Sequence, residues 1–187
     1  MKQELVTEDD VIVELKRVLA ETLRIDESAI QADSSLINDL GAESLDFLDV
    51  AYQLEQAFGI KMARHHVLEH VEEMYGEGKA IDEETDELTP AAVELLRTRF
   101  GADAPGISEG MDMDGVPALV SVRSMARGVL DVLDTLPEQC NACGASAWKK
   151  AGTQIRCGAC DAPASFANGD DLMQDWIEQV QEAKHLF

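Results

Sequence analysis

Apolar residues recur at helical spacing along the chain, and the first two such stretches each begin and end at residues typical of helix termini. The first stretch follows Thr7, which forms a capping-box pattern with Asp10. The second runs from about Ser44 to Phe58, and Gly59 then occupies the position that favours a left-handed C-cap. We therefore predict two amphipathic helices. Their periodic residues are Val11, Leu15, Val18, Leu19 and Leu23 in the first, and Leu45, Leu48, Ala51, Tyr52, Leu54 and Phe58 in the second.

The segments around these helices are less regular. Residues 25–41 lose the helical period but keep several apolar positions, which predicts a long, partly buried loop. Within residues 63–116, we expect a short helix in "ARHHVLEHVEEMYGEG" and a charged linker after it. A further helix is marked by Thr89 as N-cap, Pro90 at the first helical position and Gly101 after the end. Residues 101–115 are rich in Gly, Asp and Pro and predict a mobile loop.

Helical periodicity returns twice more. After Ser121, one apolar face contains Val122, Met125, Ala126, Val129, Leu130 and Leu133, and this helix ends before Pro137. The last segment, "NGDDLMQDWIEQVQEAKHLF", predicts a C-terminal helix that begins near Asp170 and Asp171, with a buried stripe of Leu172, Trp176, Val180 and Ala183.

The four cysteines lie close together, in "CNACGASAWKKAGTQIRCGAC". Two C-x-x-C pairs, Cys140 with Cys143 and Cys157 with Cys160, are separated by thirteen residues. Each pair can present two thiolates from a tight turn, in which we expect Gly144 and Gly158 to relieve backbone strain. Residues 148–156 predict the intervening β-hairpin. The segment resembles a zinc ribbon.

Four thiolates leave zinc no open position for water, so we interpret this motif as a structural Zn²⁺ site. Rubredoxin-like iron is the alternative. The histidines His65, His66 and His70 lack a matching carboxylate motif, although positions 66 and 70 are one helical turn apart. We interpret them as part of a solvated helix face.

The chain has 37 acidic and 15 basic residues and a formal net charge of −22. This charge repels a nucleic-acid backbone, and it outweighs the basic side chains of the expected hairpin, Lys149, Lys150 and Arg156. We therefore expect no nucleic-acid partner and a basic protein partner instead. No signal-peptide pattern follows Met1, and no run approaches the roughly 18 apolar residues that span a bilayer. We expect a cytoplasmic chain with no membrane insertion.

The stretch "INDLGAESLDFLDVAYQLEQAFGIKM", residues 37–62, resembles the signature of acyl carrier proteins. Gly41, Ser44, Leu45 and the "FGIKM" tail match that signature in order and spacing. Within the family, "SLDFLDV" followed by "FGIKM" is most similar to the specialised carriers of very long acyl chains for lipid A. The resemblance covers about residues 5–62 and, more weakly, the helix after Ser121, which resembles the last helix of the family.

The resemblance implies that Ser44 carries a covalent 4′-phosphopantetheine arm, whose thiol holds an acyl group. Apolar residues would shelter that group, and Leu48, Val50, Leu54 and Val129 are our candidates. Two features depart from the family pattern: Glu43 replaces the usual aspartate, and about fifty residues separate the second helix from the candidate last one. The first departure affects how efficiently Ser44 would be modified. The second affects which residues would form the wall of the acyl pocket.

The resemblance also implies partners: a phosphopantetheinyl transferase, and enzymes that load and transfer the acyl group. Carboxylates on the second helix are a candidate docking surface for basic patches on these enzymes. These residues are Glu43, Asp46, Asp49 and Glu55. The alternative is an ordinary solvated helix face.

These patterns together predict a mainly α protein. We expect an acyl-carrier-like helical domain in residues 1–136, with an insertion at about 63–116. A zinc ribbon and a C-terminal helix follow in residues 137–187. Ser44 lacks a nearby histidine base or a nucleophile elbow, so we predict a carrier and not an enzyme. The rival hypothesis is a zinc-ribbon interaction or regulatory module in which Ser44 only caps a helix.

Overall fold

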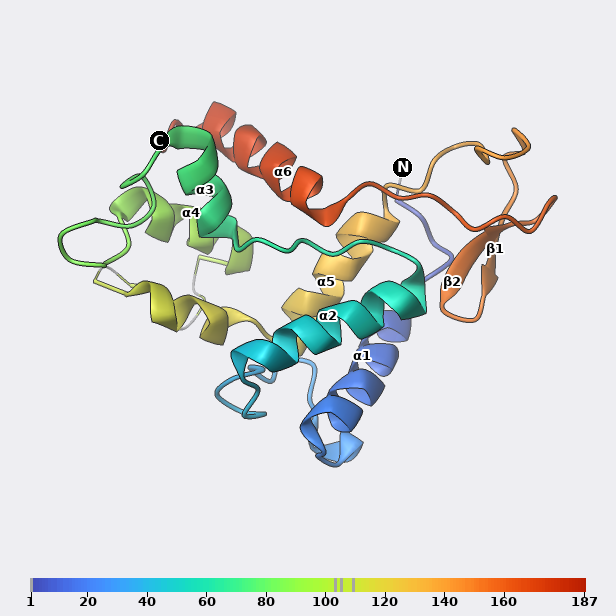
Figure 1. Cartoon of the computed structure of the whole chain (residues 1–187), viewed down its shortest axis with the longest axis horizontal. Coiled ribbons are helices and arrows are strands. Elements are labelled where there is room, and N and C mark those ends of the chain that lie inside the picture. Colours follow the sequence, from blue (N-terminus) through green and yellow to red (C-terminus); the bar gives the residue numbers. More distant parts are fainter. Residues whose placement is uncertain (1, 103, 105, 109) are drawn as a thin grey trace. The chain divides into compact units, whose positions relative to one another are not determined.

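The computed structural model describes residues 2–102, 104, 106–108 and 110–187, and it confirms a mainly α fold with one β-hairpin (Figure 1). The chain forms two compact units. The first contains the chain up to Met62 together with Ser121–Gly169, and the second contains Ala63–Val120 together with Asp170–Phe187. Each unit is therefore built from two separate stretches of sequence.

The first unit contains three of the predicted helices: α1 (Glu8–Leu23), α2 (Ser44–Phe58) and α5 (Val122–Leu133). The capping box of α1 forms as predicted, because the Thr7 hydroxyl accepts from the Asp10 amide at 3.2 Å and the Asp10 carboxylate accepts from the Thr7 amide at 2.9 Å. Gly59 ends α2 in the left-handed conformation, with φ 70°. Local sequence signals thus fix the ends of these helices.

Helix α1 packs against both α2 and α5. The long loop after α1 contains a short 3₁₀ helix, η1 (Glu27–Ala29), and buries Ile30 and Leu36, as the sequence predicts. The apolar core of the three helices comprises Val11, Leu15, Val18, Leu19, Val50, Leu54, Phe58, Val122, Ala126, Val129, Val132 and Leu133.

Helix α5 joins this bundle although the inserted segment precedes it in sequence. The Val122 amide donates to the Ser34 carbonyl at 3.0 Å, and the Arg123 amide donates to the Ala32 carbonyl at 2.7 Å. The Arg123 guanidinium contacts Asp33 and Glu8, each at 2.8 Å. These contacts hold the start of α5 against the α1–α2 loop.

The predicted hairpin consists of β1 (Trp148–Ala151) and β2 (Gln154–Cys157), paired antiparallel with Trp148 opposite Cys157. It belongs to the same compact unit as α1, α2 and α5. The indole Nε1 of Trp148 donates to the Pro137 carbonyl at 2.8 Å, and the Ala167 amide donates to the Thr135 hydroxyl at 2.9 Å. The start of β1 and the chain that follows the ribbon are therefore both tied to the residues just after α5.

The second unit contains α3 (Val67–Tyr75), α4 (Pro90–Phe100), the 3₁₀ helix η2 (Met113–Leu119) and α6 (Gly169–Lys184), which belongs to this unit from Asp170 onward. The predicted N-cap of α4 forms, with the Thr89 hydroxyl accepting from the Ala92 amide at 3.2 Å. The core of this unit includes Val67, Leu68, Val71, Val93, Leu95, Leu96, Val116, Ile177 and Val180.

The compact units divide the chain differently from the boundaries expected at residues 1–136 and 137–187. Helix α6 contributes Ile177 and Val180 to the core of the inserted segment, whereas the ribbon clusters with the carrier helices. Of the stripe expected on α6, Val180 is buried, Leu172 and Trp176 are half-buried, and Ala183 is exposed, so the expectation is wrong at Ala183. The expected domain boundaries stay a prediction.

The segment 101–115, expected to be a mobile loop, includes residues 103, 105 and 109, which lie outside the described residues. Its last part is ordered as the start of η2, where the Asp112 carboxylate accepts from the Gly115 amide at 3.0 Å. Among the residues that the structure describes, none of the helices has the length and apolarity needed to cross a membrane.

Candidate functional site

Ser44 is the first residue of α2, and it does not cap the helix. The N-cap is Glu43, whose amide donates to the Asp46 carboxylate at 2.7 Å. The Ser44 side chain is exposed, and its hydroxyl has no hydrogen-bond partner among the described residues. The capping interpretation of Ser44 is therefore wrong, and its hydroxyl is free for covalent modification.

The position of Ser44 suits an attached anion. The first-turn amides of an α-helix lack helical acceptors, and the helix dipole places partial positive charge at the same end. A phosphodiester at the N-terminus of α2 is therefore favoured by the backbone itself. No histidine among the described residues contacts Ser44, so the geometry supports a modified residue and not a nucleophilic catalyst.

The four candidate docking carboxylates differ in their surroundings. Glu43 and Asp49 are exposed, and Asp49 accepts hydrogen bonds from Gln53 at 3.1 Å and from Thr22 of α1 at 3.3 Å. Asp46 is half-buried and serves the N-cap. The docking role of these three residues stays a prediction.

Glu55 is only 2% exposed, so the expectation that it lies on the docking surface is wrong. Its carboxylate accepts from the Met62 amide at 3.0 Å and pairs with Lys61 at 3.2 Å. Glu55 therefore fixes the turn that follows α2, where a free amide would otherwise be left without an acceptor.

Helix α2 presents large apolar side chains to solvent. Leu45 is 76% exposed, Leu48 is 55% exposed and Tyr52 is 56% exposed. Leu48 therefore does not line the interior of the bundle, contrary to expectation. Val50, Leu54 and Val129 do face the interior, but they are fully packed. An acyl chain can lie among those three residues only if the helices separate.

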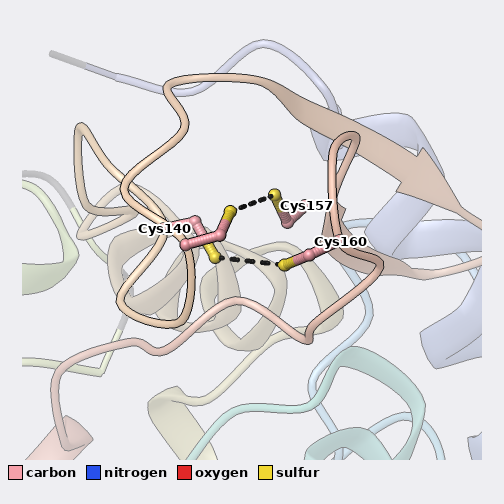
Figure 2. Close-up of side chains that lie close together, drawn as sticks. Cys140, Cys157 and Cys160 are labelled. Carbon is pink, nitrogen blue, oxygen red and sulfur yellow. Dashed lines mark hydrogen bonds between the residues drawn. The ribbon is translucent and has the colours of Figure 1, made fainter.

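The four cysteine thiols converge at one end of the hairpin, with all four Sγ atoms within 4.8 Å of one another. Figure 2 shows the sulfurs of Cys140 and Cys160 facing each other, at 3.8 Å, and Cys157 beside them. The Cys143 and Cys157 sulfurs are 3.7 Å apart. A tetrahedron with metal–sulfur bonds of about 2.3 Å has edges of about 3.8 Å, so this cluster has the right size for a four-thiolate metal centre.

The two C-x-x-C turns repeat the same backbone pattern. The Gly144 amide donates to the Cys140 carbonyl at 2.7 Å, and the Asp161 amide donates to the Cys157 carbonyl at 3.0 Å. Both donor residues are left-handed, with φ 74° at Gly144 and φ 62° at Asp161. The expected role of Gly144 is therefore confirmed, whereas Asp161 takes the equivalent position in the second turn.

Gly158 has a different role from the expected one. It lacks a left-handed φ, and its amide donates to the Ala147 carbonyl at 2.7 Å. A Cβ at this position would meet that carbonyl oxygen at 3.4 Å. Gly158 thus permits close approach between the second turn and the segment that enters the hairpin.

Backbone amides also stabilise negative charge on the cluster. The amides of Cys160 and Ala159 point toward the Cys157 sulfur and lower the pKa of that thiol to about 6. The Ala159 amide lies 3.4 Å from it. Because metals bind the thiolate form, a lowered pKa favours metal binding near neutral pH.

The hairpin turn contacts the C-terminal end of α2. The Thr153 hydroxyl donates to the Ala57 carbonyl, and the Gln154 side-chain amide donates to the Gln56 carbonyl at 3.1 Å. The carbonyls in the last turn of a helix have no amide donor within the helix. The hairpin therefore supplies donors to carbonyls of α2 that the helix itself leaves without one. Lys150 further ties the hairpin to Asp10 of α1, at 2.7 Å.

The basic side chains of the hairpin are all paired with carboxylates. Lys149 contacts Asp161 at 2.8 Å, Arg156 contacts Asp161 at 3.3 Å, and Lys150 contacts Asp10. These pairs neutralise the positive charges that a ribbon would need to bind a phosphate backbone. The expectation that the protein has no nucleic-acid partner stays a prediction.

The histidines do not form the solvated face expected from the sequence. His70 is completely buried in the core of the second unit, and only His65 of the three is exposed. Burial lowers the pKa of His66; Glu69 opposes this with a smaller effect, and His70 lowers the pKa further. The sequence interpretation failed here because the acceptor of His70 is Asp170, one hundred residues away.

Comparisons with known proteins identify the first part of the chain. Residues 13–72 match the family model described as "Phosphopantetheine attachment site". The acyl carrier protein AcpXL of Brucella melitensis is 43% identical over 67 residues, which cover 36% of this chain and 68% of that protein. AcpXL of Rhizobium meliloti is 42% identical over 67 residues, covering 36% of this chain and 66% of that protein.

An acyl carrier protein of Thermotoga maritima is 37% identical over 54 residues, covering 29% of this chain and 67% of that protein. No solved structure matches the chain. The residues matched by the family model begin within α1 and include the whole of α2, with Ser44 at its exposed start. The chain therefore belongs to the acyl carrier protein family, whose members are carriers and not enzymes.

Proposed function

We propose that Ser44 carries 4′-phosphopantetheine and that the protein presents thioester-bound acyl groups to the enzymes that load and transfer them. The observation that carries this proposal is the free, exposed hydroxyl of Ser44 at the start of α2, within the segment that matches the phosphopantetheine family. When attached, the arm supplies a terminal thiol that holds the acyl group. Ser44 provides the attachment oxygen, and the first-turn amides of α2 favour the phosphodiester charge.

We propose further that the cargo is a very long acyl chain. The similarity to two carriers named AcpXL supports this proposal, as do the "SLDFLDV" and "FGIKM" segments. A long chain would have to separate the packed residues Val50, Leu54 and Val129 or remain outside the bundle. Intact-mass measurement of the protein from its native host reports the arm and the mass of its cargo together.

The four-cysteine cluster holds one structural Zn²⁺ in this proposal. Its sulfur separations support a tetrahedral four-thiolate centre, which leaves no coordination position for substrate or water. Metal analysis of the purified protein should find one zinc held by Cys140, Cys143, Cys157 and Cys160. Iron in place of zinc would make the centre rubredoxin-like and would contradict the assignment of the metal.

Coexpression with a phosphopantetheinyl transferase tests the carrier function. We expect a mass increase of one phosphopantetheinyl group in the parent and none in Ser44→Ala, with unchanged helical content by circular dichroism. Ser146→Ala is the matched control, because Ser146 is also exposed but lies in the ribbon segment. Modification at another serine would contradict the assignment to Ser44, and an unmodified parent would support the interaction-module hypothesis.

We propose that Glu43, Asp46 and Asp49, together with the exposed Leu45 and Leu48, form the docking surface for these enzymes. Asp46 also serves the N-cap, so its charge is best removed by Asp46→Asn, which keeps a side-chain oxygen for the Glu43 amide. We expect Glu43→Gln and Asp49→Asn to slow loading more at low salt than at high salt, because salt screens exposed charges. Equal loading rates for these variants and the parent at low salt would exclude the surface.

A further inference from the structure

The second compact unit contains a cluster of metal-ligating side chains that the carrier function does not use. His65, His70 and Glu73 each place one possible ligand atom within 4.8 Å of the other two. His70 and Glu73 lie on the same side of α3, three residues apart, and His65 lies just before this helix. The rings of His65 and His70 meet edge to face, with centroids 5.5 Å apart.

Asp170 orients this cluster from the start of α6. Its Oδ1 atom accepts from the Arg64 amide at 2.8 Å and from the His65 amide at 3.1 Å, and it lies 3.2 Å from Nε2 of His70. With three donors around it, this carboxylate oxygen holds the Nε2–H tautomer of His70. The other ring nitrogen, Nδ1, then carries a lone pair. Histidines that bind a metal typically donate their other ring N–H to a carboxylate in this way.

The lone pair of His70 Nδ1 lies beside a second potential ligand. The Glu73 carboxylate is 3.9 Å from Nδ1, and the Gln174 side-chain nitrogen is 3.4 Å from it. His70 is completely buried, whereas the side chains of His65 and Glu73 are 54% and 57% exposed. The cluster therefore has one fixed ligand and two that can rotate toward it from solvent.

We propose that His65, His70 and Glu73 bind a divalent transition-metal ion of the zinc class, with Asp170 as the positioning residue for His70. A tetrahedral site with metal–nitrogen bonds of about 2.0–2.1 Å has ligand separations of about 3.4 Å. Rotation of the exposed His65 and Glu73 side chains shortens the distances between the ligand atoms to this value. The metal replaces the contact between Gln174 and His70 Nδ1.

Three protein ligands leave a fourth position for water or an exogenous donor. In this respect the site differs from the four-thiolate cluster, whose positions are all filled by protein sulfur. The proposed metal at the second site is therefore exchangeable and open to a ligand, whereas the one proposed for the ribbon is closed. The two sites should be separable by stoichiometry and by exchange with chelators.

The test uses the full-length reduced protein, first supplied with one equivalent of zinc to fill the cysteine site and then titrated with more zinc by calorimetry. We expect the parent to bind a second equivalent, and His65→Ala and Glu73→Gln to bind it at least tenfold more weakly. Both substitutions are at exposed side chains, so folding should be preserved; circular dichroism checks this. His185→Ala is the matched control, because His185 is an exposed histidine of the same unit outside the cluster.

Nitrogen NMR of the imidazole rings provides a second readout. Zinc addition should shift Nδ1 of His70 and leave its Nε2 protonated, which a merely structural histidine would not show. The proposal is overturned if the parent binds only one equivalent of zinc. It is also overturned if His185→Ala weakens the second equivalent as much as His65→Ala does, since that result indicates adventitious binding to surface histidines.

Discussion

The two ends of α2 have opposite surroundings. At the N-terminal end, Ser44 is exposed and its hydroxyl has no partner among the described residues. At the C-terminal end, Thr153 and Gln154 of the hairpin donate to the Ala57 and Gln56 carbonyls, and the buried carboxylate of Glu55 fixes the following turn.

The same helix is thus free at the end that we propose carries the arm and held at the other. A modified serine must be reached by several enzymes in turn, so its end of the helix has to remain open. A rigid carrier also needs α2 to keep its position on the bundle, and contacts far from Ser44 can provide this without obstructing it. This difference between the two ends indicates that the ribbon stabilises α2 at the end far from Ser44, where its contacts do not obstruct access to the serine. The predictions below test whether this separation of the two ends is real.

The largest effect should follow loss of the metal centre that we propose for the four cysteines. In Cys157→Ser one thiolate is missing and the ribbon loses the binding energy that orders it. We expect hydrogen exchange to increase strongly throughout residues 137–166 and also in the last turn of α2, where the hairpin donates its hydrogen bonds. Loading of Ser44 should continue. Loss of loading in this variant would show that the two ends of α2 are coupled.

Removal of the Glu55 carboxylate should cost less but still destabilise the first unit substantially. Glu55→Ala leaves the part-buried Met62 amide without this acceptor and removes the ion-pair partner of the exposed Lys61, and we expect about 2–4 kcal/mol of lost unfolding free energy. Glu55→Gln is the matched control, because it keeps an oxygen for the Met62 amide. Urea denaturation measures both variants, and equal stabilities for them would mean that the charge, not the hydrogen bond, matters.

A smaller loss should accompany removal of the hairpin hydroxyl that contacts α2. Thr153→Val deletes the donor to the Ala57 carbonyl while keeping the side-chain shape, and we expect a loss of about 1 kcal/mol. Thr153→Ser should retain most of that stability. Exchange of amides near Ser44 should be the same in both variants. Faster exchange at that end in Thr153→Val would contradict the separation of the two ends.

The smallest effect concerns the exposed ion pair between the hairpin and α1. The hydrogen bond from Lys150, aided by bonds from Thr7, lowers the pKa of Asp10 to about 2. Lys150→Met should raise this pKa toward the unperturbed value of about 3.9, which NMR titration of the carboxyl measures. Lys149→Met should leave it unchanged, because Lys149 pairs with Asp161.

The sign of the stability effect follows from the lowered pKa. Because the pKa of Asp10 is lower in the folded protein, the pair stabilises the fold fully above the unfolded value near 3.9 and loses this contribution as the pH falls toward 2. We expect the parent and Lys150→Met to differ by about 0.5 kcal/mol or less at neutral pH, since both side chains are more than a third exposed. If the stability difference between the parent and Lys150→Met persisted at pH 2, it would not arise from this ion pair.

Many of the helix ends in both units follow from sequence alone because their signals are local. The capping box of Thr7 and Asp10, the left-handed Gly59 and the Thr89-Pro90 helix start depend on residues within one or two turns of each other. The free hydroxyl at Ser44 could not be distinguished from a capping hydroxyl by sequence, because Glu43 and Ser44 are both near the helix start. The backbone angles of Glu43 show that Glu43, and not Ser44, is the N-cap of the helix.

The sequence by itself determined the helices, the serine that we propose as the attachment site and the four-cysteine motif, since periodicity and spacing encode each of them over a short stretch. Only the tertiary structure decided which long-range partners they have. The buried Glu55 carboxylate accepts a hydrogen bond from an amide in the turn that follows α2. Helix α6 packs into the core of the inserted segment through Ile177 and Val180. His70 meets Asp170 across one hundred residues. Such contacts depend on how separate amphipathic faces are buried against each other, which no local pattern specifies.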